Sequence, residues 1–285
     1  MVRLVTYKRS SLVIILGVVA LSVACAAMQP PNAGGPEMGQ PYPIVVREQP
    51  QRREASVLAL NRLAPGNVQQ EQANLHLQPV TATIKSLPAN LSTPLLLPKV
   101  GTAAEMNEEE TREALRRFID DWRNLIGANP LQLSLVNRTD RPDGVKVATY
   151  EQRPFRYPLR GDYGKLEIQF TANRRLVNVS SSCIPDAERL QTALAATAPR
   201  VKSEDAVKQL LSKSVTYADA QGNQQTYSVS SANKVTPGEV VTFVRASKDR
   251  PDTLELSVAW EISVADAPFK YVYIDAITNE VIATR

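Results

Sequence analysis

An alternating pattern near the C-terminus restricts the fold of this chain more than any other feature. Between Leu254 and Val264 every second residue is large and apolar, and the residues between them are small or polar. This period of two predicts a β-strand with one buried face. Residues 269–274 repeat the extended pattern, residues 275–280 supply turn formers, and residues 281–283 form a short returning strand. No segment resembling a catalytic domain follows, so we expect the protein to act through surfaces.

A capped amphipathic helix is predicted from Asn107. Asn107 is a favourable N-cap, acidic residues fill the first turn, and Glu110 can complete a capping box. Apolar residues then recur at helical spacing as far as Ile126. Gly127 can end the helix in a left-handed conformation, and Pro130 prevents its continuation. The sequence therefore predicts one continuous helix up to Ile126.

Helices and strands occur twice in the same order. The helix that begins at Asn107 precedes extended segments and a hairpin over residues 165–179. Helical patterns over 186–196 and from Ser203 then precede strands between 226 and 283. The predicted fold class is α+β, with two tandem helix-plus-antiparallel-sheet domains after a signal peptide and a Pro/Gln-rich tether. The predicted boundaries are 1–26 for the signal peptide, 27–105 for the tether, 106–183 for the first domain and 184–285 for the second.

The N-terminus has the pattern of an export signal. Arg3, Lys8 and Arg9 form a positive region, and the apolar stretch over residues 12–23 ends in small residues. This stretch is shorter than the roughly 20 apolar residues that a membrane-spanning helix needs. We therefore expect the chain to be exported.

Two kinds of processing fit the end of this signal. The segment LSVACAA resembles a bacterial lipoprotein box, in which a small residue, here Ala24, precedes the cysteine that becomes lipidated, here Cys25. Ser22 stands where the box has an aliphatic residue. The alternative is an ordinary cleavage after Ala26. The first outcome anchors the protein by a lipid on the periplasmic or outer surface of a membrane, and the second releases a secreted protein.

Prolines are concentrated after the signal. Eleven of the chain's 20 prolines fall between Ala27 and Glu105, together with the glutamine-rich segment NVQQEQ. Such a composition buries too little apolar surface to offset the entropy of ordering, so the first half of this region is predicted to be a flexible tether. The second half, with the apolar residues from Leu75 to Leu97, fits either short strands or a peptide that packs along the next domain.

The charge balance argues against a nucleic-acid partner. The chain has 33 Lys and Arg against 29 Asp and Glu. Three of the cations lie in the signal peptide, so the mature chain is close to neutral. Strong binding to nucleic acid depends on many Lys and Arg contacts to phosphate and is therefore not expected.

The two units resemble a known arrangement. The helix FIDDWRNLIG, the motif Tyr150-Glu-Gln152, the strand LEIQF and the hairpin TANRRLVNV look like a fungalysin/thermolysin-propeptide domain. Ser203-Glu-Asp-Ala206 with LSVAWEISV and YVYIDAITNEVI looks like a PepSY domain. Together they cover residues 106–285, in the order found in propeptides of thermolysin-like zinc metalloproteases. The resemblance implies a module that, in that family, assists the folding of the attached protease and inhibits it.

Two turns depart from the family pattern. Asn279 stands where the family usually has Gly before Glu280, and Asn173 stands where Asp-Gly is common. Asparagine tolerates a positive φ better than most residues do. We therefore expect both turns to be kept, with the asparagine in that conformation.

Catalytic and metal-binding motifs are missing. His76 is the chain's one histidine, so an HExxH helix cannot form, and no G-x-S-x-G elbow or phosphate-binding glycine motif occurs. We expect no enzyme activity, no cofactor and no metal. Cys183 has no partner for a disulfide if Cys25 is lipidated or removed. Cys183 is expected to be a small buried residue, and the alternative is a reactive or intermolecularly paired thiol.

The segment over residues 153–160 is the strongest candidate for a binding surface. It combines arginines with aromatic side chains, which are enriched at interface hot spots. The alternative is a solvated rim that keeps a sheet edge from aggregating. The candidate protein-binding residues are Arg153, Phe155, Arg156, Tyr157 and Arg160.

These observations lead to one expected class of function. We expect an exported, non-catalytic protein-binding module, an envelope-anchored structural or scaffolding lipoprotein whose partner is a protein of the envelope or a secreted protein. The alternative is a trans-acting inhibitor or folding partner of a secreted zinc metalloprotease. A second aromatic stripe, at Phe269, Tyr271 and Tyr273, is expected to be core.

Overall fold

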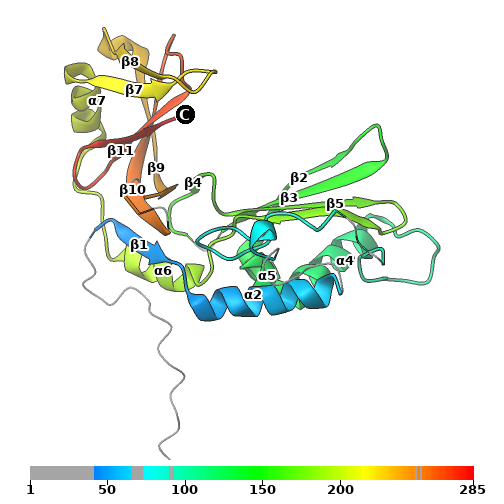
Figure 1. Cartoon of the computed structure of the whole chain (residues 1–285). Helices are drawn as coiled ribbons and strands as arrows, with labels where there is room; N and C mark the ends of the chain where they lie inside the picture. The colour runs from blue at the N-terminus through cyan, green and yellow to red at the C-terminus, as the bar shows by residue number, and fades with distance from the viewer. Residues whose placement is uncertain are drawn as a thin grey trace, which may run out of the picture. The chain divides into compact units, whose positions relative to one another are not determined.

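The computed structural model describes residues 42–65, 73–89, 91, 93–153, 155–247, 249–250 and 252–285 (Figure 1). All of them belong to one compact unit. The predicted signal peptide, the lipidation candidate Cys25 and the first part of the predicted tether lie outside the described residues. Within the described ranges, the helices are too short or too polar to cross a membrane.

Antiparallel sheets form the framework of the chain. One sheet has four strands in the order β2 (Leu133–Asp140), β3 (Val145–Gln152), β5 (Lys165–Thr171) and β6 (Leu176–Ser181). A six-stranded sheet has the order β12 (Val281–Thr284), β11 (Tyr271–Asp275), β10 (Thr253–Val264), β9 (Val235–Ala246) and β4 (Leu159–Gly161), with β1 (Ile44–Arg47) also paired to β10. A small hairpin consists of β7 (Ser214–Ala218) and β8 (Gln224–Ser228). Only the pairing of β4 with β9 is parallel among these strands.

Helices cover one face of each large sheet. The elements are α2 (Pro50–Leu63), α4 (Glu108–Asp121), α5 (Arg123–Ile126), α6 (Ala187–Ala195) and α7 (Ser203–Ser212), with short 3-10 turns η1 (Asn74–His76), η2 (Pro130–Gln132) and η3 (Ala232–Lys234). Figure 1 shows α2, α4 and α5 on the same side of the four-stranded sheet. Leu60, Phe118 and Ile168 join these helices and the sheet in one apolar core. Helices α6 and α7 pack on the second sheet, and the predicted α+β class is confirmed.

The predicted alternating strand is the central strand β10, but both of its faces are buried. Its large apolar residues contact α6 at one end and α7 at the other. The opposite face also excludes solvent, because Ala259 packs with Phe243 and Tyr273. Ser257 and Glu261 on that face are also buried, whereas Glu255 and Ser263 near its ends are half-buried. The period of two located the strand correctly, whereas the prediction of a single buried face was wrong.

The capping box at Asn107 forms as predicted. The Asn107 side chain accepts a hydrogen bond from the Glu110 amide, and the Glu110 carboxylate accepts one from the Asn107 amide, each at 2.9 Å. The predicted continuous helix, however, is interrupted at Trp122, whose backbone leaves helical geometry at φ −111° and ψ 20°. Helix α5 then ends at Gly127 in the left-handed conformation, with φ +85°.

The described part of the predicted tether is folded. Ile44 pairs with Leu256 of β10, and α2 buries Leu60 completely in the core of the four-stranded sheet. Two prolines mark the limits of α2 instead of preventing it, since Pro50 occupies its first turn and Pro65 follows its end. Composition alone misled the prediction here, because the burial depends on distant partners, α5 for α2 and β10 for β1.

The segment that follows packs along the first domain, as one of the two predicted alternatives proposed. Ile84, Leu87 and Leu97 are buried in the same core. The amide of Ser181 donates to the Ile84 carbonyl at 2.6 Å, and the amide of Leu176 donates to the Leu95 carbonyl at 2.8 Å. The outer edge of β6 is thereby covered.

The second sheet takes strands from both sides of the predicted boundary at residues 183 and 184. Strand β4 lies within the predicted first domain but pairs with β9. Gly161 allows this close approach, because a Cβ there would lie 2.3 Å from the Val244 carbonyl oxygen and its φ is +105°. The loop that contains β4 therefore joins the two predicted domains.

One of the two turn predictions is correct. Asn279 adopts φ +62°, as expected. In the first hairpin the positive φ is at Arg174, at +70°, and not at Asn173. The Arg174 guanidinium donates to the Leu97 carbonyl at 2.9 Å, a contact with a distant segment that favours this residue in the turn. Of the aromatic stripe, Phe269 and Tyr273 are buried as predicted, whereas Tyr271 is only half-buried.

Candidate protein-binding surface

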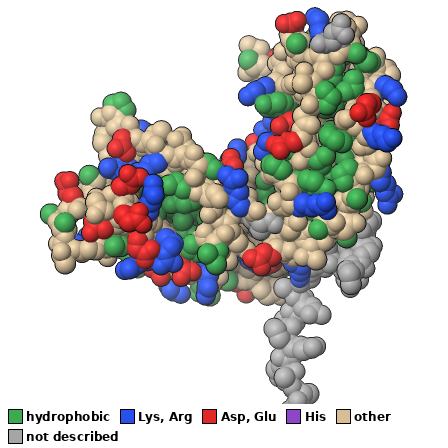
Figure 2. All heavy atoms as spheres, turned by 180° about the vertical axis from the view of Figure 1, so that it is seen from behind, with side chains coloured by type: hydrophobic (Ala, Val, Ile, Leu, Met, Phe, Trp, Pro, Cys, Tyr) green, Lys and Arg blue, Asp and Glu red, His purple; other side chains and the backbone are tan. Residues whose placement is uncertain are grey.

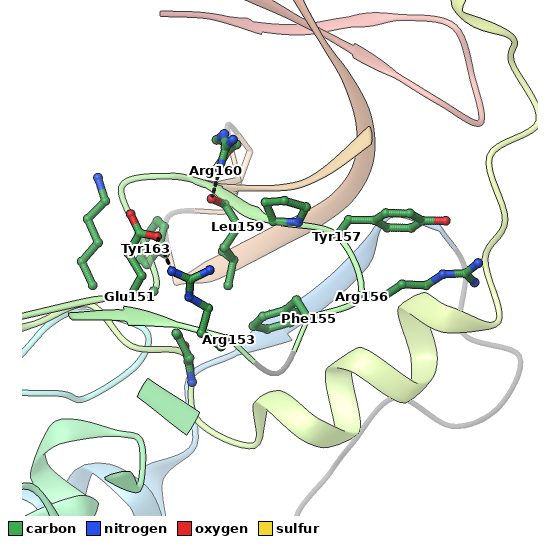
Figure 3. Close-up of a pocket in the computed structure, with 12 residues that line it drawn as sticks. Glu151, Arg153, Phe155, Arg156, Tyr157, Leu159, Arg160 and Tyr163 are labelled. Carbon is green, nitrogen blue, oxygen red and sulfur yellow. Dashed lines mark hydrogen bonds and ion pairs between the residues drawn. The ribbon is translucent and has the colours of Figure 1, made fainter. Parts of the chain in front are cut away.

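The loop between β3 and β5 encloses a hollow of about 190 Å³. Every sequence-predicted binding residue lines it, together with Gln152 and the start of β5 (Figure 3). The loop leaves the four-stranded sheet, contributes β4 to the second sheet and returns. The five predicted residues are thus brought together, but they take different roles.

Phe155 anchors the loop from inside. It is buried in the apolar cluster that contains Leu190 of α6 and Val244 of β9. Its burial withdraws it from the surface, so it cannot contact a partner in this arrangement. Burying a phenylalanine stabilises the loop by roughly 1.5–3 kcal/mol.

Arg156 is exposed on the loop, and the half-buried Tyr157 lies beside it. The Arg156 guanidinium lies over the Tyr157 ring, with its Cζ atom 5.3 Å from the ring centroid. The Arg156 amide donates to the Gln191 side chain of α6 at 2.5 Å, which fixes the backbone beneath the pair. Both labelled side chains extend above α6 in Figure 3. Such a stacked arginine and tyrosine present a flat cationic surface to solvent.

Arg160 is committed to an internal ion-pair network. Its Nε donates to Glu261 and its Nη2 donates to Glu239, both at 2.8 Å. The Tyr273 hydroxyl donates to the same Glu261 carboxylate at 2.9 Å. Burial by itself would lower the pKa of Arg160, but the hydrogen bond and the charge of Glu261 outweigh it and raise that pKa.

The neighbouring Asp162 adds a second ion pair to the same loop. The two guanidinium nitrogens of Arg285 donate to its two carboxylate oxygens, each at 2.6 Å. This bidentate pair lowers the pKa of Asp162, with the hydrogen bond to Arg285 as the main cause. Two ion pairs, Arg160 with Glu261 and Asp162 with Arg285, therefore fix the β4 segment.

Arg153 also lines the hollow, and its side chain is exposed. Its guanidinium is 4.0 Å from the Glu151 carboxylate, a weak surface pair, and its amide donates to the Gln132 carbonyl at 2.9 Å. Arg153, Arg156 and Tyr157 are consequently the predicted residues that remain available to a partner.

Gln152 positions this loop and was missed as a site residue. Its side-chain amide donates to the Ile184 carbonyl, and its side-chain oxygen accepts from the Ile184 amide, each at 2.9 Å. This two-point contact fixes the end of β3 to the segment that leads into α6. The sequence analysis used Gln152 only as part of the Tyr150-Glu-Gln152 motif that carries the family resemblance, and the motif did not indicate that Gln152 positions the loop.

The other candidate groups do not gather at this loop. Cys183 is fully buried, and burial raises the pKa of its thiol to about 12. The His76 Nδ1 atom lies 3.3 Å from the Ser86 hydroxyl. Within the described residues, no three His, Cys, Asp or Glu side chains are placed to share a metal ion.

The chain matches no protein-family model and no curated protein. The resemblance to propeptide and PepSY domains therefore stays a prediction from the quoted motifs.

Proposed function

We propose that this protein is an exported, non-catalytic protein-binding module, a structural or scaffolding lipoprotein anchored in the cell envelope. The supporting observation is the Arg156–Tyr157 pair, which is displayed on a loop held rigid from below. Phe155 and Gln152 fix the loop at its base, so little conformational entropy is lost when a partner binds. Arginine and tyrosine are the residue types that carry most binding energy at interfaces.

The charge distribution favours a protein partner over a polyanion. Figure 2 shows basic and acidic side chains interspersed across the visible face, without a continuous basic field. The exposed guanidiniums of Arg153 and Arg156 both line the hollow, and Arg153 has only a weak surface pair with Glu151. An acidic and partly apolar protein surface would complement them.

A site-specific crosslinking experiment tests this proposal. p-Benzoylphenylalanine placed at Tyr157 in the full chain should capture an envelope protein in living cells. The same group at Tyr217, another half-buried tyrosine, is the matched control. The changes Arg153→Ala and Arg156→Ala should reduce capture, whereas Arg141→Ala, at an exposed hairpin tip, should not. Equal capture from positions 157 and 217, or none from 157, would refute the proposed surface.

The anchor is proposed from the N-terminal sequence. We propose that Cys25 carries a lipid that holds the protein at the membrane. Mass spectrometry of the mature N-terminus should find a lipidated Cys25, and Cys25→Ser should move the protein into the soluble fraction. A mature chain that begins at Ala27 would exclude the anchor and leave the secreted form.

A protease partner is the second candidate. It is supported by the succession of two helix-plus-sheet units in the order of the resemblance described above. The purified full chain should then slow a secreted thermolysin-like protease, and the double change of Arg153 and Arg156 to alanine should relieve the inhibition. Undiminished protease activity together with no co-purifying peptidase would eliminate this candidate.

A further inference from the structure

Strand β2 leaves one edge of the four-stranded sheet open. It pairs with β3 on one side, and no strand pairs with its other side within the described residues. The opposite edge of this sheet, β6, is covered by the segment that contains Ile84 and Leu95. An uncovered edge presents backbone N–H and C=O groups that can pair with another chain.

A groove of about 420 Å³ lies beside this edge. Helix α4 supplies Arg112, Arg116 and Ile119, and the sheet supplies Leu133, Leu135 and Tyr150. An edge strand flanked by a helix is the arrangement in which added peptide strands bind, because the strand supplies hydrogen bonds and the groove receives alternate side chains.

Exposed apolar residues cluster in the segment that supplies Leu133 and Leu135 to the groove. Leu131 is 96% exposed, and Leu135 and Val136 are also exposed. Three of the eight large hydrophobic residues found exposed in the described chain thus fall within six consecutive positions. Such clustering marks an interaction site more often than scattered exposure does.

The polar side chains that line the groove are two guanidiniums and a phenol. The Tyr150 hydroxyl makes no hydrogen bond to any described residue, although the side chain is nearly buried. Burial raises the pKa of Tyr150 to about 12 against the opposing charges of Arg112 and Arg138. Among the described residues that line the groove there is no carboxylate. An acidic side chain would find both a hydroxyl donor and guanidiniums there.

Around the groove, four guanidiniums (Arg112, Arg116, Arg117 and Arg138) share three carboxylates (Glu108, Glu109 and Glu113), and Glu109 lies 3.9 Å from Arg112. Glu113 is shared by Arg116 and Arg117, at 2.7 Å from the Nε atom of each. Glu108 pairs with Arg112 at 2.8 Å and lies 3.9 Å from Arg138. Glu108 and Glu113 each face two guanidiniums, and these pairs are exposed enough to exchange partners at little cost.

We propose that the groove between β2 and α4 binds an extended segment of a partner protein as an added β-strand, with alternate apolar and acidic side chains directed into the groove. A bulge between Leu135 and Asn137 divides the edge of β2, and the groove adjoins the part that precedes it. The whole strand has eight residues, so a segment of about five to seven residues can pair along it on both sides of the bulge. The groove shares no lining residue with the hollow at the Arg156–Tyr157 loop. A failure of either proposed binding site therefore leaves the other proposal unaffected.

A labelled heptapeptide provides the test. The fluorescein-labelled peptide TLTETLT, titrated with the full mature chain, should bind in the micromolar range by fluorescence anisotropy. Replacing its glutamate with lysine should weaken binding by about tenfold or more, because one charge-assisted contact is replaced by repulsion. N-methylation of the backbone amides that face β2 should abolish binding while leaving the side chains unchanged.

The helix offers a matched pair of variants. Arg116 and Arg117 have similar exposure and both contact Glu113, but only Arg116 lines the groove. Arg116→Glu should weaken peptide binding about tenfold, and Arg117→Glu should leave it within about twofold. Addition of the peptide should also slow hydrogen exchange of the β2 amides.

Several outcomes would overturn the proposal. No binding at millimolar protein, equal binding of the N-methylated peptide, or equal effects of Arg116→Glu and Arg117→Glu would each do so. A protein that dimerises in light scattering and becomes monomeric with Arg116→Glu would reassign the edge to a second copy of the chain.

Discussion

Arg160 and Glu261 are 101 positions apart in the sequence, yet the Nε atom of the first lies 2.8 Å from the carboxylate of the second. The contact joins the loop between β3 and β5 to the central strand of the other sheet. Glu261 is only 8% exposed, so its charge depends on Arg160 and on the Tyr273 hydroxyl for compensation. The pair therefore holds the two sheets together and sets the position of the candidate binding loop.

Removing the arginine should be costly. Arg160→Met should lower the free energy of unfolding by about 2–3 kcal/mol, because it leaves a buried carboxylate without its main partner. Arg153→Ala, which breaks only a surface pair, should change it by less than about 0.5 kcal/mol. Urea denaturation measures both. Adding Glu261→Gln to Arg160→Met should restore part of the loss, and an absence of such coupling would argue against the pair.

Helix α2 offers a direct test of whether the region after residue 42 is folded. Leu60→Ala should cost about 3 kcal/mol, because Leu60 is fully buried. Leu58→Ala, on the same helix but 65% exposed, should cost less than about 0.5 kcal/mol. Thermal or chemical unfolding of the two variants separates a folded element from a tether, for which both changes would be neutral.

The thiol of Cys183 should be unreactive in the folded protein. With its pKa raised from the ordinary 9.0 to about 12, only about one thiol in ten thousand is ionised at pH 8. Iodoacetamide should modify the Cys183 peptide only after denaturation, as read by peptide mass spectrometry. Rapid modification under native conditions would show that the site opens.

The raised pKa of Cys183 also predicts that the free energy of unfolding falls at high pH. Below pH 9 the thiol is protonated in both the folded and the unfolded state, so the full stability of the fold is present. As the pH rises from about 9 to about 12, the unfolded chain loses the proton first and stability declines. Cys183→Ala should remove this component of the alkaline decline, measured as the free energy of unfolding between pH 8 and pH 10.

The turn at Asn279 predicts two opposite substitution effects. Asn279→Ala should cost about 1 kcal/mol, because φ is +62° and alanine disfavours that conformation. Asn279→Gly should leave stability unchanged or slightly raised, since glycine adopts this φ freely and the Asn279 Oδ1 atom is buried without a hydrogen bond. A large loss with glycine would show that the asparagine side chain contributes to the fold.

Local signals were sufficient for some elements. The Asn107 capping box and the alternation in β10 each follow from interactions within a few residues, and both occur in the structure. Pro50 and Pro65 were misread because composition treats every proline alike, whereas the structure uses them at the ends of a helix. Arg174 takes the positive φ in its hairpin because a distant carbonyl at Leu97 accepts from its side chain.

For the candidate surface, the sequence identified the right segment and its residue types. It could not tell that Phe155 is an internal anchor, that Arg160 is used by Glu261, or that Gln152 fixes the base of the loop. Those assignments depend on which remote groups meet each side chain. The periodicity and capping of single elements are local properties, so the sequence by itself determined them. Burial and charge pairing between elements are properties of the packed chain, and only the tertiary structure decided them.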